Sequence, residues 1–501
     1  MLVEALRPPA VRTVAAVRIE LVVLAAIVAF LVANLPYLEA WPTAHNDEAR
    51  ELNAFWVASG ADPRARGLDP QYGYDPLYKG GLQGLTVGLA LRVGGLGLLQ
   101  GRLVSLAWGG LLLMLVFLIG RRLYGPFGGV LAAFCLALSR PFLVASHMVR
   151  PDVVLAAMLA GACLLALRGA QERLPRANLA AGLLLGLALD VHLNALAFMP
   201  LVGFVYPAVL GGRFGRDRST HLFALGLALG ALYYLLVRVA PDPGQFASAS
   251  SFWIGIDKRP PILSADPAWM LGEELGRFRV YFTEDRRLEL AVLVAAMALA
   301  AGRAVRRRQA DPLLLGLAAA FGLFVTIVSS KSEFYVVLFY PWLTLLLAGA
   351  AVRAIGLAPQ LRVPLGVLAV AAVPFVFGLQ DNYEDIATAA GNFGERGYYA
   401  LIDEIRPVIP AGASILGPPL FWIGLSDHPY TDYYVWERLR AERRERFSDY
   451  VARLKPDLVV LDVKSRHQVA INSPGFLESN GVLLKTVKHV GFDRVEVWKL
   501  S

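Results

Sequence analysis

Long apolar segments recur from about residue 17 to about residue 379, and they constrain the fold of this chain more than any other feature. A helix needs roughly 20 apolar residues to cross about 30 Å of hydrocarbon. Hydrophobic residues make up 56% of the 501 residues and charged residues only 18%, a mixture too apolar for a soluble globular protein of this size. The sequence therefore predicts a mainly α-helical, polytopic membrane protein.

We expect about eleven membrane-spanning helices, or twelve to thirteen if marginal segments are also counted. They are expected at about residues 17–38, 103–120, 127–145, 153–168, 177–190, 193–210, 220–239, 287–302, 313–328, 333–352 and 363–379. Residues 77–93 are marginal as a span because they are short and contain Lys79 and several glycines. We interpret that segment as a half-buried interfacial helix.

Arginines lie in alternate connections between these helices, which gives the orientation, because short cytoplasmic loops retain Lys and Arg. The predicted inner connections contain Arg121 and Arg122; Arg168, Arg173 and Arg176; Arg213, Arg216 and Arg218; Arg303 and Arg306 to Arg308; and Arg353 and Arg362. This pattern predicts an inner (plasma) membrane protein with a cytoplasmic N-terminus. The same arginines account for the net charge of +8, so we expect no nucleic-acid partner.

Residues 380–501 differ from the rest, because charges, prolines and short alternating apolar runs replace the long apolar segments. We interpret them as a soluble α/β domain on the extracytoplasmic side, following a transmembrane domain at residues 1–379. Helices are expected at about 398–406 and 436–454, and strands at about 413–416, 457–462, 483–489 and 495–500. No Gly-rich phosphate loop follows the first strand, so we expect no nucleotide site there.

The two cysteines, Cys135 and Cys163, both lie in apolar segments. They form neither a disulfide framework nor a metal-ligand spacing. The sequence therefore indicates no required cofactor and no metal site, although it does not exclude a divalent cation.

Two polar clusters fall in the predicted first outer loop. Asp47 and Glu48 come directly after the first helix, where adjacent carboxylates are costly unless they are solvated, paired or used. The alternative is a charged helix cap, since Asn46 or Asp47 suits that position. Tyr78 and Lys79 follow in the same loop, either as interfacial anchors or as groups that contact a sugar and a phosphate.

A third cluster, His147, Arg150 and Asp152, lies between the third and fourth predicted helices. Asp152 follows a proline and can be an ordinary first-turn acid, which complements the helix dipole. An acid and a base at the rim of the membrane also suit substrate binding.

A fourth cluster, Lys331 and Tyr335, precedes a predicted helix, and His192 lies in another outer turn. Lysine commonly extends its amine to the membrane surface, so an anchoring role is the alternative. A lysine with a tyrosine at this depth also suits a lipid-linked phosphate, whose oxygens accept strong hydrogen bonds. The arginine-based topology places all these clusters on one face, which favours a shared function over chance.

These residues, taken in order, resemble a known family. The motifs are Asp47-Glu48, Pro76-Leu77-Tyr78, Gly120-Arg121-Arg122-Leu123-Tyr124-Gly125, Arg150-Pro151-Asp152, and Lys331 with Tyr335 ahead of Pro341. Together they resemble the GT-C superfamily, and within it the protein O-mannosyltransferase and lipid A aminoarabinose transferase branch. The motifs span most of residues 17–352.

The resemblance implies a GT-C-like fold and an inverting glycosyltransferase that acts at the extracytoplasmic face. It implies a polyprenyl-phosphate sugar as donor, a glycan, glycolipid or protein as acceptor, and Asp47 as catalytic base. Lys331, with Lys79 or Arg150, would stabilise the leaving phosphate. The remaining substrate-binding candidates are Glu48, Tyr78, His147, Asp152, His192 and Tyr335. The scheme needs neither a nucleotide sugar nor a bound metal.

The chain departs from the family pattern after Ala49, where Arg50 and Glu51 replace an aromatic position, and at Asp75, which replaces the first of two prolines. The outer loop at residues 240–286 is either a lid over the site or a surface loop. Two other functions stay open: a transporter or flippase for lipid-linked glycans, and a non-catalytic scaffold of an envelope complex. The sequence shows no paired halves or broken helices that would favour transport.

Overall fold

The structure is a computed structural model of the whole chain. It describes residues 14–59, 81–244, 246–247, 266–282, 286–307, 311–328, 332–489 and 492–500. These residues form two compact units. Unit 1 comprises Met1–Asn34, Ser105–Ser146 and Pro151–Tyr383, and unit 2 comprises Leu35–Val104, His147–Arg150 and Glu384–Ser501.

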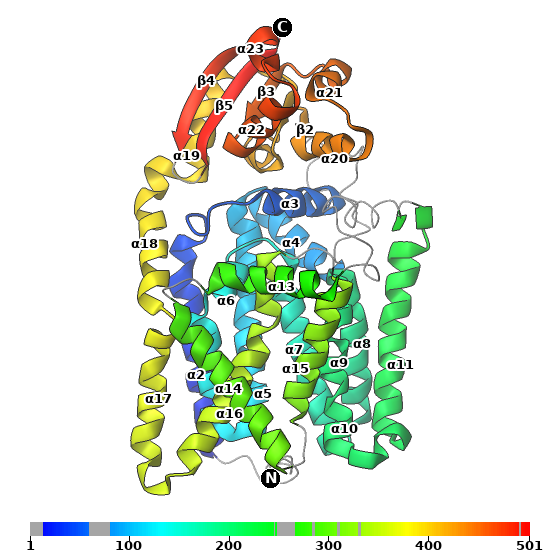
Figure 1. Cartoon of the computed structure of the whole chain (residues 1–501), viewed down its shortest axis with the longest axis vertical. Helices are drawn as coiled ribbons and strands as arrows, with labels where there is room; N and C mark the ends of the chain where they lie inside the picture. Colours follow the sequence, from blue (N-terminus) through cyan, green and yellow to red (C-terminus); the bar gives the residue numbers. More distant parts are fainter. Residues whose placement is uncertain are drawn as a thin grey trace. The chain divides into compact units, whose positions relative to one another are not determined.

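Unit 1 is helical, and Figure 1 shows most of its long helices running roughly alongside one another. Its helices are α2 (Val14–Asn34), most of α5 (Leu98–Leu138), α6 (Arg140–Ser146), α7 (Pro151–Glu172), α8 (Pro175–Val191), α9 (Ala195–Gly203), α10 (Val205–Leu210), α11 (Arg218–Tyr234), α13 (Pro267–Tyr281), α14 (Arg287–Arg307), α15 (Pro312–Ile327), α16 (Tyr340–Gly356), α17 (Arg362–Val376) and the start of α18 (Leu379–Arg396). Each of the eleven expected segments contains helix, which confirms a multi-pass membrane protein.

Fewer helices than expected are long and apolar enough to span a membrane by themselves: six in the described part of the chain, or seven if the bent pair α17 and α18 counts as one. One reason is that α5 counts once although it contains two helices, which are separated, as expected, by the non-helical Gly125 (φ 85°, ψ 176°). A second reason is Pro341, which begins α16, so that residues 333–338 form a separate 3-10 turn. A third is that α8, α15 and α16 each contain only 16 or 17 residues.

Helices α8 and α11 touch through their backbones. A Cβ added to Gly182 would lie 1.9 Å from the carbonyl oxygen of Phe223, and one added to Gly226 would lie 2.1 Å from that of Leu179. Only glycine fits at such a contact, and small residues allow this close approach between membrane helices. The glycines therefore explain how two highly apolar helices pack together.

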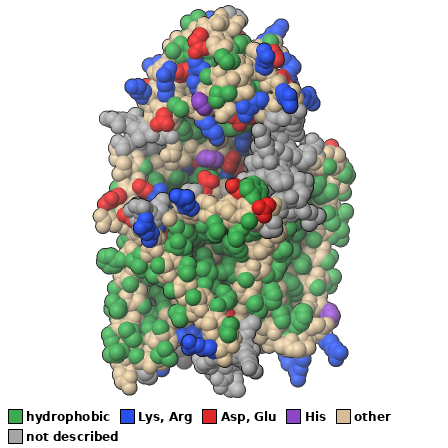
Figure 2. All heavy atoms as spheres, in the orientation of Figure 1, with side chains coloured by type: hydrophobic (Ala, Val, Ile, Leu, Met, Phe, Trp, Pro, Cys, Tyr) green, Lys and Arg blue, Asp and Glu red, His purple; other side chains and the backbone are tan. Residues whose placement is uncertain are grey.

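The outward side of unit 1 is apolar, as expected for a surface in contact with lipid. Leu21, Leu299 and Val367 are each at least 60% exposed. Figure 2 shows hydrophobic side chains covering much of the visible side of these helices. A soluble protein rarely exposes so continuous an apolar surface.

Unit 2 contains a five-stranded mixed sheet in the order β2-β1-β3-β5-β4, which confirms the expected C-terminal α/β fold. The strands are β1 (Ile415–Gly417), β2 (Tyr430–Asp432), β3 (Leu458–Leu461), β4 (Gly481–His489) and β5 (Asp493–Leu500). Strand β1 is parallel to β2 and β3, whereas β5 is antiparallel to β3 and β4. Strand β2, of three residues, was not predicted.

Helices cover both faces of this sheet, so β3 is buried throughout. Leu458 and Val460 belong to one hydrophobic cluster, and Val459 and Leu461 belong to another. This alternation is the two-residue period of a strand whose faces are both covered. One expected helix, at 436–454, is two helices, α20 (Tyr433–Arg443) and α21 (Phe447–Leu454), because Arg444 adopts a left-handed conformation. Residues of α20 and α21, and of α22 (Val463–Asn472) and α23 (Phe476–Asn480), belong to the second hydrophobic cluster, with Val459 and Leu461.

The first hydrophobic cluster, which contains Leu458 and Val460, also includes residues of three helices. Two of them, α3 (Asn46–Ser59) and α4 (Gly81–Gly94), follow α2 in the chain, and the third is α19 (Tyr398–Ile405). Ala49, Leu52 and Trp56 are spaced three and four residues apart, so they form one apolar stripe on α3. This stripe packs with residues of the sheet and of the turn at residues 419–424. The packing fixes α3, and it thereby fixes the direction of the polar turn at its start.

Helix α4 has one buried and one exposed face, as predicted for residues 77–93. Val87 and Leu91 are buried, whereas Leu85, Leu89 and Val93 are exposed. Residues 77–80 lie outside the described residues. In the loop at 240–286, α13 is described, but residues 248–265 are not, so the choice between a lid and a surface loop remains a prediction.

Candidate functional site

The first turn of α3 is closed by reciprocal hydrogen bonds. The backbone N–H of Asp47 donates to Nδ1 of His45 at 3.2 Å. In return, the backbone N–H of His45 donates to Oε2 of Glu48 at 3.0 Å. This is the geometry of a capping box, with histidine in place of serine or threonine. It fixes the backbone that carries Asp47.

Glu48 and Arg102 form a fully buried ion pair, since both side chains are 0% exposed. Arg102 donates from Nε to Oε1 at 2.8 Å and from Nη2 to Oε2 at 2.6 Å. Its Nη1 donates to the carbonyl oxygens of Leu38 and Pro42, and the N–H of Val149 donates to Oε1 of Glu48 at 3.0 Å. Both carboxylate oxygens of Glu48 therefore accept hydrogen bonds from the protein. The Glu48–Arg102 pair connects the segment at residues 38–48, helix α5 and the backbone at Val149.

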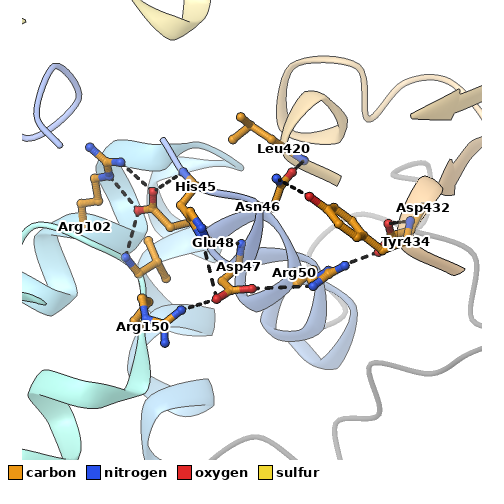
Figure 3. A network of polar contacts seen from close by, with 11 residues as sticks. His45, Asn46, Asp47, Glu48, Arg50, Arg102, Arg150, Leu420, Asp432 and Tyr434 are labelled. Atoms are coloured by element: carbon orange, nitrogen blue, oxygen red, sulfur yellow. Dashed lines mark hydrogen bonds and ion pairs between the residues drawn. The ribbon is translucent and has the colours of Figure 1, made fainter. Parts of the chain in front are cut away.

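Asp47 lies among cationic side chains (Figure 3). Its Oδ2 forms an ion pair with Nη1 of Arg150. Its Oδ1 lies 3.6 Å from Nη1 of Arg50, and its Oδ2 lies 3.7 Å from Nδ1 of His45. The Asp47 side chain is 33% exposed, whereas that of Arg150 is only 7% exposed. Asp47 is therefore the accessible carboxylate of the pair Asp47 and Glu48.

A second layer of contacts reaches the C-terminal region. Nε of Arg50 donates to Oδ2 of Asp432 at 3.2 Å, and the guanidinium lies 4.7 Å from the ring centre of Tyr434. Asn46 donates to the hydroxyl of Tyr434 and accepts from the N–H of Leu420, each at 3.2 Å. We call the set of His45, Asn46, Asp47, Glu48, Arg50, Arg102, Arg150, Asp432 and Tyr434 the Asp47 cluster. All its members belong to unit 2.

The structure groups the predicted site residues in two places. Unit 2 holds Asp47 in an ion pair with Arg150, and Glu48 accepts from the neighbouring backbone N–H of Val149. It also holds His147, which is buried with its ring centre 5.5 Å from that of Trp41. Unit 1 holds His192 and Tyr335, whose Nε2 and hydroxyl are 3.4 Å apart, and also Asp152 in the buried first turn of α7. Tyr78, Lys79 and Lys331 lie outside the described residues, so their roles remain predictions.

Sequence reasoning did not single out Arg102 or Asp432, and it noted Arg50 only as a departure from the family pattern. Arg102 had a usable signal, because a charged side chain beside a long apolar segment usually has a buried partner. Asp432 had none, since 382 positions separate it from Arg50. Only the folded sheet brings these residues together.

Glu39 offers a test of electrostatics at the edge of this site. Partial burial raises the pKa of its carboxyl group, and Arg102 and a hydrogen bond from Tyr399 oppose that rise. A raised pKa means that the folded state binds the proton more tightly than the unfolded state. The stabilisation that Glu39 contributes is fully present at pH values below the pKa of its carboxyl group in the unfolded state. It is lost as the pH rises through the pKa of that group in the folded state.

We therefore expect Glu39→Gln to flatten the decline in thermal stability that follows as the pH rises above about 4.5, the ordinary pKa of this carboxyl group. Thermal unfolding of the purified protein in detergent at a series of pH values measures this. Glu404→Gln, at an exposed position of the same unit, is the control. An unchanged pH profile in the Glu39 variant would contradict the prediction.

Among the described residues, no group of three or more His, Cys, Asp and Glu side chains is arranged to hold a metal ion. The partners of Asp47 in the cluster are instead two arginines and a histidine. Arginine presents several donors in a fixed plane, which suits carboxylate and phosphate oxygens.

Comparison with known proteins agrees with the GT-C resemblance. Residues 83–237 match the family described as dolichyl-phosphate-mannose-protein mannosyltransferase. The fold of the chain is GT-C-like. Its fold is similar to that of ArnT from Cupriavidus metallidurans bound to undecaprenyl phosphate, with a TM-score of 0.63 over 96% of this chain and 98% of that one, at 15% identity.

Two further solved structures share the GT-C fold. ArnT from the same organism in the apo state gives a TM-score of 0.59 at 18% identity, over 95% of this chain and 98% of that one. The oligosaccharyltransferase of Archaeoglobus fulgidus, in complex with Zn and sulfate, gives 0.53 at 14% identity, over 92% of this chain and 71% of that one. No curated protein matches the sequence significantly. Likeness at such low identity establishes the fold of the chain alone.

Proposed function

We propose that this GT-C protein is an inverting glycosyltransferase that moves a sugar from a polyprenyl phosphate to a glycan, glycolipid or protein acceptor. The observation that supports this most is the Asp47 cluster, which sets a partly exposed carboxylate against the guanidinium groups of Arg150 and Arg50. The similarity of the fold to an ArnT structure that contains undecaprenyl phosphate supports the donor class.

Asp47 has the role of general base in this proposal. As the acceptor hydroxyl attacks the anomeric carbon, its proton passes to the Asp47 carboxylate. The bond between the anomeric carbon and the phosphate oxygen breaks, and its electron pair stays on the phosphate. A carboxylate within hydrogen-bond reach can perform this transfer. Glu48 is less suited to it, because Arg102 and two backbone N–H groups already engage its oxygens.

Arg150 would stabilise the lipid phosphate as it leaves. Negative charge grows on the phosphate during transfer, and a nearly buried guanidinium stabilises such charge strongly. Arg150 pairs with Asp47, so a bound phosphate would compete for the same cation. That competition would free Asp47 to accept a proton when the donor is in place. Lys331 and Lys79 remain additional candidates for contact with the phosphate.

The arginine pattern gives the side of the membrane on which the reaction would occur. With the arginine-rich connections in the cytoplasm, the first loop and the C-terminal region are extracytoplasmic. Polyprenyl-linked donors are amphipathic, so a site beside the membrane surface can receive the sugar while the lipid chain stays in the bilayer.

A transfer assay with the purified chain in lipid nanodiscs tests the function. We expect transfer of radiolabelled sugar from a polyprenyl-phosphate sugar to an envelope acceptor fraction, and no transfer from the matching nucleotide sugar. Polyprenyl phosphate itself should bind and raise the unfolding temperature, because a ligand stabilises the state that binds it. A chain that neither binds polyprenyl phosphate nor transfers from any lipid-linked sugar would refute the proposal.

Arg150→Gln should reduce transfer efficiency, kcat/KM for the lipid donor, by about tenfold to 100-fold, since a hydrogen bond to a charged group contributes about 1.5–3 kcal/mol. Steady-state kinetics with varied donor measure the loss, and Arg150→Lys should restore part of it. Arg406→Gln is the matched control, because Arg406 pairs with Asp427 at an exposed surface of the same unit. Equal kinetics in the Arg150 and Arg406 variants would rule out a role in phosphate contact.

A further inference from the structure

Asp432 has no part in the proposed reaction, yet it contacts the Asp47 cluster directly. It lies at the end of β2, and its side chain is 8% exposed. One oxygen, Oδ1, accepts from the backbone N–H of Tyr434 at 2.8 Å and caps α20. The other, Oδ2, accepts from Nε of Arg50 at 3.2 Å. A single carboxylate thus anchors both a helix of the C-terminal region and an arginine of α3.

Arg50 is shared between two carboxylates, and Asp432 has the closer contact. Its Nε lies 3.2 Å from Asp432, whereas its Nη1 lies 3.6 Å from Asp47. The same guanidinium lies over the ring of Tyr434, with Cζ of Arg50 4.7 Å from the ring centre. Figure 3 shows the Arg50 side chain extended from α3 toward Asp432. The C-terminal region therefore holds this arginine at the edge of Asp47.

The position of Arg50 matters because a carboxylate loses basicity as cations approach it. Asp47 already has one direct ion pair, with Arg150. If Arg50 were released, it could add a second direct pair and make Asp47 a weaker proton acceptor. Asp432 opposes this by holding the Arg50 guanidinium.

We propose that Asp432 is a positioning residue, through which the C-terminal region holds Arg50 and keeps Asp47 basic enough to act. This inference rests on the proposed function and assigns a role to the soluble domain. His45 and Arg150 also face Asp47, and Glu437 of α20 interacts with Arg50. All three remain unchanged in the variants below.

Asp432→Asn is the primary test, because asparagine caps a helix as well as aspartate does but carries no charge. We expect kcat for sugar transfer to fall by up to about tenfold, because a weaker base accepts the proton less readily, while KM for the donor stays within about twofold. Asp462→Asn is the matched control. Asp462 also caps a helix of this unit, α22, by accepting from Ser465 at 2.7 Å.

The decisive measurement repeats Asp432→Asn in an Arg50→Gln background. If Asp432 acts through Arg50, its replacement there should change kcat by less than about twofold, because the interaction it controls is already absent. A purely structural role would give the same loss in both backgrounds and would overturn the inference. Equal losses for the Asp432 and Asp462 variants, or an unchanged kcat, would also overturn it.

Failure of this inference differs from failure of the proposed function. If wild-type transfer occurs and requires Asp47, an inert Asp432→Asn variant refutes only the positioning role. If the wild type transfers nothing from lipid-linked sugars, the proposed function itself fails. Should Asp432→Asn not fold, Asp432→Ser replaces it, since serine is an equally good helix cap without charge.

Discussion

Asp47→Asn is expected to lower kcat for transfer from a polyprenyl-phosphate sugar by about 10²-fold to 10⁴-fold, because an amide cannot accept the proton of the acceptor hydroxyl. The fold should survive the change. Asparagine is also a good residue for the start of a helix, and the capping bonds involve the backbone of Asp47 and the side chains of His45 and Glu48.

Donor binding gives this prediction a second readout. Replacing Asp47 leaves Arg150 without its carboxylate partner, so the affinity for polyprenyl phosphate should stay equal or increase. A variant that had merely unfolded would lose binding as well as turnover. Asp427→Asn is the control, because Asp427 forms an exposed ion pair in the same unit and should retain full activity. Full activity of Asp47→Asn would remove Asp47 from the mechanism.

The helical part of the fold was predictable because the signal for a membrane span is local. A run of about twenty apolar residues identifies a membrane span without any information about the rest of the chain. The non-helical Gly125 within α5 agrees with the expected boundary between two spans. What the sequence did not show is the separate 3-10 turn at residues 333–338 and the continuation of α18 beyond the last predicted span.

The candidate site was predictable only in part. The arginine-based topology predicts that Asp47 and Arg150 lie on one side of the membrane, and the structure brings these two residues, 103 positions apart, into contact. It could not reveal that Glu48 is fully occupied by Arg102, because the two adjacent carboxylates look equivalent in sequence. Their difference arises from the helix turn: Glu48 points into the protein and is fully buried, while Asp47 remains one-third exposed.

The association of the first loop with the C-terminal region had no sequence signal. Hydrophobic residues of α3 join the core of the sheet, and the stripe that includes Leu52 is indistinguishable in sequence from any amphipathic helix. Its consequence is functional, because the sheet then fixes the helix that carries Asp47. The C-terminal region, which differs in composition from the rest of the chain, is therefore part of the structure that positions the proposed base.

We expect Arg102→Met to lower the free energy of unfolding of unit 2 by about 3–5 kcal/mol. This is the cost of leaving one partner of a buried ion pair without the other. Glu48 would remain as a buried charge, and the carbonyl oxygens of Leu38 and Pro42 would lose their donor. Urea or thermal unfolding in detergent, followed by tryptophan fluorescence, measures the loss. Arg453→Met, at an exposed ion pair with Glu445, should cost less than about 1 kcal/mol.

The double variant Glu48→Leu/Arg102→Met separates the charge pair from the hydrogen bonds around it. Removing both charges eliminates the unpaired buried ion, so the double variant should be less destabilised than the sum of the two single variants. It should not regain wild-type stability, because the N–H groups of His45 and Val149 would still lack an acceptor. Additive losses would show that Glu48 and Arg102 act independently. In that case the loop after α2 would be held mainly by the apolar packing of α3 against the sheet.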